Sequence, residues 1–130
     1  MKSELIAPCG MNCNLCIAYL REKRKYLCSC PGCRGNNKDK PNSCIRCIIK
    51  NCEILKKNNW KYCSVKCEKY PCQRLKNLDK RYRKKYVMSM IENLGFIEKN
   101  GIRKFIKSEE KRWIKDNKIF CVHNKKYFDI

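Results

Sequence analysis

The chain has 130 residues, with 32 Lys or Arg, 12 Asp or Glu and 13 Cys, and its formal net charge is +20. This length suits one domain or two small ones. No apolar run reaches the length of a transmembrane helix, and residues 1–8 lack the apolar stretch of a signal peptide. We therefore expect a cytoplasmic protein without a membrane partner, in which thiols stay reduced and metal is favoured over disulfides.

Short helices and loops are predicted for residues 1–72, between four groups of three cysteines. A helix is expected over residues 15–26, a loop with Pro31-Gly32 over residues 28–43, and a second short helix over residues 44–57. Few large apolar side chains accompany them, so this half needs staples to fold. The pattern predicts a small, metal-stapled, α-rich irregular module over residues 1–72, which a chelator should unfold.

The pattern changes over residues 73–130, where two helices are predicted to pack on the cysteine-rich module as one folded unit. An apolar stripe with helical spacing runs from residue 74 to residue 94, and Gly95 suits its C-terminal cap. A second helix is predicted over residues 101–114, with Asn100 as N-cap. Residues 118–130 alternate loosely and favour a short hairpin turning at Asn124-Lys125-Lys126. The second helix would bury Ile102, Phe105, Ile106 and Trp113.

Twelve cysteines within the first 72 residues are the candidate metal ligands. Four thiolates form the usual shell of a structural zinc or an iron–sulfur cluster, so twelve predict about three zinc ions. Because the gaps within the triplets are irregular, each metal is expected to take ligands from more than one triplet, and the sequence does not fix the pairing. One or two of the twelve could instead be buried free thiols. The predicted ligands are Cys9, Cys13, Cys16, Cys28, Cys30, Cys33, Cys44, Cys47, Cys52, Cys63, Cys67 and Cys72.

Zinc is the expected ion because it asks only for a tetrahedral set of thiolates. The alternative is an iron–sulfur cluster in a redox or sensing protein. The spacing Cys9-x3-Cys13-x2-Cys16 matches the four-iron motif of radical S-adenosylmethionine enzymes, but those enzymes require a barrel far larger than this chain. The ferredoxin run C-x2-C-x2-C-x3-C is absent. Among the cysteines, Cys28 is the weakest predicted ligand, since only one residue separates it from Cys30.

The lasting positive charge belongs to residues 73–130, which hold 17 Lys or Arg against 7 Asp or Glu. Thiolates on divalent zinc would neutralise much of the excess in residues 1–72. The densest basic patch is a candidate phosphate-contacting face for nucleic acid, or a contact for an acidic protein. The plainer interpretation is the solvated side of an amphipathic helix. The patch consists of Arg81, Arg83, Lys84 and Lys85.

No catalytic constellation is visible. His123 is the only histidine, and Cys121-Val122-His123 supplies too few donors for a metal site of its own. There is no phosphate loop and no paired-carboxylate signature. The leading interpretation is thus a zinc-binding adaptor with nucleic-acid contact through its basic half. A small metal- or cysteine-dependent enzyme remains a third alternative, and the sequence specifies no oligomeric state.

Four further motifs are residues 7–13, Cys30-Pro31-Gly32-Cys33-Arg34, the triplet Cys63/Cys67/Cys72 and residues 81–94. Together they resemble a cysteine-rich family of bacteria and archaea, known as domain of unknown function 3795. The resemblance spans nearly the whole chain and implies a cytoplasmic, metal-binding protein without an established activity. Relatives often carry further cysteines around a C-terminal Cys-Val-His segment. Only Cys121-Val122-His123 remains here, which implies that this site is lost and Cys121 is a free thiol. Position 28 is irregular in relatives, and with eleven ligands one site would take a water or another donor.

Overall fold

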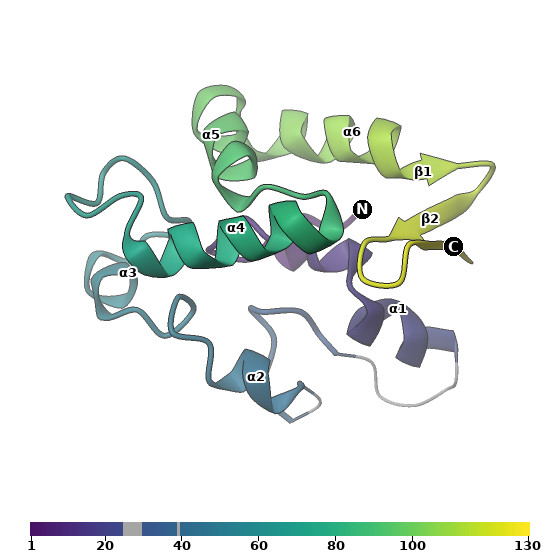
Figure 1. Cartoon of the computed structure of the whole chain (residues 1–130), viewed down its shortest axis with the longest axis horizontal. Helices are drawn as coiled ribbons and strands as arrows, with labels where there is room; N and C mark the ends of the chain where they lie inside the picture. The colour runs from purple at the N-terminus through teal and green to yellow at the C-terminus, as the bar shows by residue number, and fades with distance from the viewer. Residues whose placement is uncertain (25–29, 39) are drawn as a thin grey trace.

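The computed structural model describes residues 1–24, 30–38 and 40–130. It is helix-rich and has one small three-stranded sheet, in agreement with the predicted α-rich class. In Figure 1 the long helix α4 crosses the middle, with α5 and α6 on one side and the segment of α2 and α3 on the other. The elements are η1 (Ser3–Leu5), η2 (Cys13–Leu15), α1 (Ile17–Arg24), α2 (Asn42–Ile45), α3 (Glu53–Asn58), α4 (Gln73–Tyr86), α5 (Met90–Asn100), α6 (Ile102–Trp113), β1 (Ile114–Lys115), β2 (Lys118–Cys121) and β3 (Lys126–Asp129).

The helix predicted over residues 74–94 is in fact two helices, α4 and α5. Helix α4 ends at Val87, whose φ of 53° places it in the left-handed region, and Ser89 then caps α5. The Ser89 hydroxyl accepts a hydrogen bond from the Glu92 N–H at 3.1 Å, as an N-cap serine does. The predicted C-cap at Gly95 was therefore wrong, because Gly95 lies inside α5.

A buried carboxylate holds the junction between α4 and α5. Asp79 is only 5% exposed and accepts hydrogen bonds from the Ser89 hydroxyl at 2.7 Å and the Ile91 N–H at 3.0 Å. Its other oxygen forms an ion pair with Arg83 at 2.8 Å. A buried carboxylate is tolerated because these donors satisfy it, and the same bonds fix the angle between the two helices.

The remaining C-terminal predictions differ less from the structure. Helix α6 closely follows the predicted second helix, and it buries Phe105 and Trp113. Its N-cap is Gly101, not Asn100, which is the last residue of α5. The predicted hairpin is confirmed as β2 and β3, which pair antiparallel with Ile119 opposite Phe128. A short strand, β1, adds to the other edge of β2 and was not predicted.

One apolar core joins the first twenty residues to α4, α5 and the hairpin. The N-terminal loop is tied to this core by hydrogen bonds as well as by packing. The Val122 N–H donates to the Leu15 carbonyl at 3.1 Å, and Asn12 Nδ2 donates to Glu109 Oε1 at 3.2 Å. The fully buried apolar side chains of this core are Leu15, Leu75, Met90, Leu94, Cys121 and Val122.

Residues 40–72 fold differently, as short turns with little apolar core. The helix predicted over residues 44–57 is replaced by α2 and α3, which are four and six residues long. Within this stretch the buried apolar side chains are Ile49 and Leu55. Helices this short are unstable alone. Ile49, with the partly buried Tyr62 and Tyr70, attaches the segment to the main core. The other predicted N-terminal helix appears as α1, starting at Ile17 rather than residue 15; residues 25 and 26 lie outside the described residues.

Candidate metal centre

Eleven of the twelve predicted ligands fall within the described residues, and Cys28 lies outside them. Apart from Cys30, these cysteines are free thiols, as is Cys121 on β2. Cys9, Cys30 and Cys121 are buried, and the others are partly exposed. Within residues 1–24, 30–38 and 40–130, no three Cys, His, Asp or Glu side chains already form a ready coordination shell. A metal would therefore have to draw neighbouring sulfurs together, so the question is which thiols are neighbours.

Cys9 and Cys13 lie in the N-terminal loop and face cysteines from later triplets. Burial raises the pKa of Cys9 to about 12, the Met11 N–H lowers it, and negative charge on Cys33, Cys47 or Cys63 would raise it further. Burial also raises the pKa of Cys13, with an opposing contribution from the Cys33 N–H. The loop that carries Cys9 is held to the fourth triplet by a backbone bond from the Cys63 N–H to the Pro8 carbonyl at 2.9 Å. The loop of the first triplet is thus held next to the fourth triplet, although the two are far apart in sequence.

Cys16 forms a second neighbourhood at the start of α1. Burial raises the pKa of Cys16 to about 11, while the N–H groups of Ala18 and Tyr19 lower it and charges on Cys30 and Cys44 would raise it. Backbone N–H groups aimed at a sulfur stabilise its thiolate, as in zinc knuckles. Cys30 approaches because its N–H donates to the Ala18 carbonyl at 3.5 Å.

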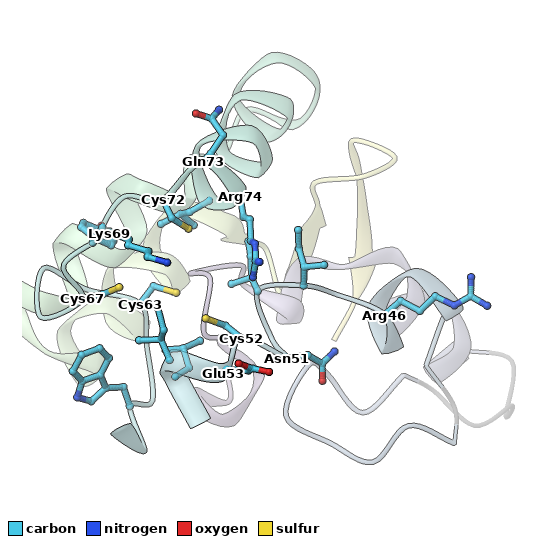
Figure 2. A pocket seen from close by; sticks show the side chains of 17 residues that line it. Arg46, Asn51, Cys52, Glu53, Cys63, Cys67, Lys69, Cys72, Gln73 and Arg74 are labelled. Carbon is cyan, nitrogen blue, oxygen red and sulfur yellow. The ribbon is translucent and has the colours of Figure 1, made fainter. Parts of the chain in front are cut away.

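The third neighbourhood surrounds Cys63. Burial raises the pKa of Cys63 to about 12, and the next largest causes are the charges that Cys72, Cys52 and Cys67 would carry, followed by Cys47. Cys52, Cys63, Cys67 and Cys72 all line one pocket of about 550 Å³ between α3 and the start of α4. Figure 2 shows their four sulfur atoms around this pocket.

Without a bound cation, these raised pKa values determine the protonation state of the thiols at neutral pH. A thiol with a pKa of 11 to 12 is almost entirely protonated at neutral pH and is a weak nucleophile, which disfavours Cys9, Cys16 and Cys63 as activated catalytic residues. A divalent metal reverses this effect because it binds and stabilises the thiolate. The donor set therefore suits metal binding in type and number.

His123 is engaged inside the protein by both ring nitrogens. Its Nδ1 accepts a hydrogen bond from the Ile17 N–H at 3.3 Å, so the neutral ring carries its proton on Nε2, which lies 2.9 Å from the Tyr82 hydroxyl oxygen. The Tyr86 ring packs edge-on at 4.8 Å between centroids. A metal-ligand role for His123 would require one of these hydrogen bonds to break, so its position here is structural.

This environment predicts a measurable titration of the only histidine. Burial lowers the pKa of His123 below its ordinary 6.5. The unfolded chain therefore binds this proton more readily, so the stability linked to His123 is complete above pH 6.5 and is lost as the pH falls below it. The Hε1 resonance in proton NMR should titrate with a midpoint below 6.5 in the folded protein and near 6.5 in urea. A folded midpoint at or above 6.5 would contradict this environment.

The four predicted basic contacts lie on α4 and are all solvent-exposed. They are not equivalent, since Arg83 is held by its ion pair with Asp79. The Arg81 guanidinium stands 6.0 Å from the centroid of the Tyr82 ring. Arg81, Lys84 and Lys85 therefore form the part of the patch that is available to a partner. No helix within the described residues has the length and apolar character needed to cross a bilayer.

Sequence reasoning did not find the residues that surround the cysteines in the pocket. Lys69 and Arg74 line it beside the sulfurs, and Trp60 and Leu55 supply apolar wall. The position of Lys69 between Cys67 and Cys72 could have indicated its place beside the sulfurs. No sequence motif indicates Trp60 or Leu55.

A comparison with family profiles matches residues 5–77 to the family described as "Protein of unknown function (DUF3795)". The matched range includes all four cysteine triplets and the start of α4. No curated protein and no solved structure matches the chain.

Proposed function

We propose that this chain, which belongs to the DUF3795 family of proteins of unknown function, binds zinc through its cysteines and uses the metal to hold residues 40–72 in place. The observation that carries the proposal is the gathering of thiols from distant triplets. Cys52 of the third triplet lines one pocket with Cys63, Cys67 and Cys72 of the fourth. The Cys63 N–H also bonds to the Pro8 carbonyl beside Cys9 at 2.9 Å, and there is no disulfide among the described cysteines. Reduced cysteines in such numbers, beside a segment with little apolar core, fit structural zinc sites.

Elemental analysis with a visible spectrum tests this proposal on protein purified without air. The expected result is about three zinc ions per chain, four thiolates to each, and no iron. Iron with acid-labile sulfide and visible absorbance would overturn the zinc assignment and make redox or sensing chemistry the leading function. Protein free of both metals, with all cysteines open to alkylation, would overturn metal binding altogether.

An adaptor role follows from the exposed side of α4. Arg81, Lys84 and Lys85 project from one helix, and their side chains are free for phosphate contacts. Binding of nucleic acid through such contacts falls steeply with added salt because counterions are released. The proposed partner is therefore a polyanion, with nucleic acid as the leading candidate.

Neutralising Arg81, Lys84 and Lys85 together to Gln should weaken binding to a duplex probe and flatten its salt dependence. Three lost phosphate contacts reduce the slope of log K against log salt by about 3. The matched control changes three exposed lysines of α6, Lys104, Lys107 and Lys111, to Gln, which removes the same charge from another helix. Equal losses in both variants would show that net charge, and not the α4 surface, drives the binding. Fluorescence anisotropy at several salt concentrations measures both.

A further inference from the structure

We infer that Cys52, Cys63, Cys67 and Cys72 form one four-thiolate metal site, separate from the sites formed by the other described cysteines. The inference rests on the proposed zinc binding and names the ligands of one site. The assignment joins the last cysteine of the third triplet to the whole fourth triplet, a grouping that the order of the triplets does not reveal.

The first support is the shared pocket. These four cysteines line the same cavity of about 550 Å³, and none of the other described cysteines lines it. The sulfurs stand around the cavity in Figure 2. Because the cavity is wider than a bare ion requires, the side chains have room to change rotamer and close around a metal.

The second support is the backbone that presents each sulfur. Cys52 and Cys72 occupy the positions before α3 and α4, and neither side chain is used in a capping hydrogen bond. Cys67 follows a turn closed by its own N–H to the Ser64 carbonyl at 3.0 Å. Cys63 is fixed by its bond to Pro8. The four thiols are thus anchored at defined points of the backbone while their sulfurs remain available.

The third support is electrostatic. A zinc ion with four thiolates carries a net charge of −2. The same pocket is lined by three cations, Arg46, Lys69 and Arg74, and by one carboxylate, Glu53, which leaves two positive charges in excess. The 14-residue helix α4 adds the positive end of its dipole at Cys72. These charges offset the anionic charge of the proposed site.

The other described cysteines lie outside this pocket. Its lining does not include Cys9, Cys13, Cys16, Cys30, Cys33, Cys44 or Cys47. We therefore assign these seven cysteines to the other proposed sites.

Metal-protected alkylation of the wild-type protein tests the grouping without any mutation. The zinc-loaded chain is treated with stepwise additions of EDTA, free thiols are trapped with N-ethylmaleimide, and native and peptide mass spectra count zinc and labels. In molecules that lose this zinc, Cys52, Cys63, Cys67 and Cys72 should be labelled together. Labelling of one of the four together with cysteines of another neighbourhood, while its three partners stay protected, would overturn the inference.

A variant set gives a second, independent test. Cys67→Ser should lose one zinc, and Cys67→Ser with Cys72→Ser should also lose only one, because both ligands serve the same ion. Cys67→Ser with Cys44→Ser should lose two, since Cys44 does not line this pocket and is assigned to another ion. Loss of two ions from the Cys67/Cys72 pair would overturn the grouping. Wild-type protein without zinc would instead overturn the proposed function itself, so the two failures are distinguishable.

Discussion

Removal of zinc by a strong chelator is expected to unfold residues 40–72 while residues 5–20 and α4 to α6 keep most of their structure. Each structural zinc contributes about 10–16 kcal/mol of apparent binding free energy to folding. In residues 40–72, Ile49 and Leu55 are the buried apolar side chains, and α2 and α3 are too short to persist alone. The sequence predicts that all of residues 1–72 unfold. From the structure we expect a smaller segment to unfold, residues 40–72, because Leu15 and its neighbours pack in one core with the C-terminal half.

Hydrogen exchange with peptide-level mass spectrometry locates this effect. Amides of residues 40–72 should lose protection after chelation, whereas those of α4 to α6 should retain it, and far-UV circular dichroism should fall only in part. Readdition of zinc is the control for reversibility. Unchanged protection throughout would contradict a structural role for the metal, and complete loss in every segment would show that the core also depends on it.

Replacing Gly10 by Ala should destabilise the protein by at least about 3 kcal/mol. Gly10 has a φ of +90°, which side-chain-bearing residues rarely adopt. A Cβ at this position would lie 2.7 Å from the Met90 carbonyl oxygen and 2.9 Å from Leu94 Cγ, both in the packed core. The backbone must then shift and strain the bond from Asn93 Nδ2 to the Gly10 carbonyl. Urea unfolding of the metal-loaded protein measures the loss.

Gly95 supplies the matched control for the same substitution. It lies within α5, where a Cβ would meet nothing within 4 Å. Gly95→Ala should therefore stabilise the protein, by up to about 1 kcal/mol from helix propensity. If Gly10→Ala unfolds at the same urea concentration as Gly95→Ala, the N-terminal loop does not pack against α5 as closely as the structure places it.

The sequence identified which side chains of the C-terminal half are buried better than it identified where helices end. Leu75, Met90 and Leu94 lie on the apolar stripe predicted over residues 74–94, and all three are buried, although the helix breaks between them. The break between α4 and α5 is marked by a local sequence pattern, although the apolar spacing continues across it. Ser89 and Glu92 stand three residues apart, the spacing of a capping box, and Ser89 is the observed N-cap of α5.

The proposed grouping of the cysteines could not be predicted from the sequence, because it depends on tertiary contacts. Cys52 is eleven residues before Cys63, and only the turn after α3 brings both to one pocket. The Cys63 N–H also reaches Pro8 across 55 residues, which no local pattern encodes. The sequence supports only the prediction that twelve cysteines bind metal, and it does not indicate which sulfurs would share an ion.

The bond between the Leu15 carbonyl and the Val122 N–H sets an order of events during synthesis. Contacts that join residues so far apart in sequence are slow to form, and on the ribosome this one must wait until the hairpin has emerged. All twelve N-terminal thiols are translated before that point. The nascent chain therefore presents all twelve proposed sulfur ligands while its core is still open. If the chain binds zinc as proposed, metal capture would precede the closing of the fold.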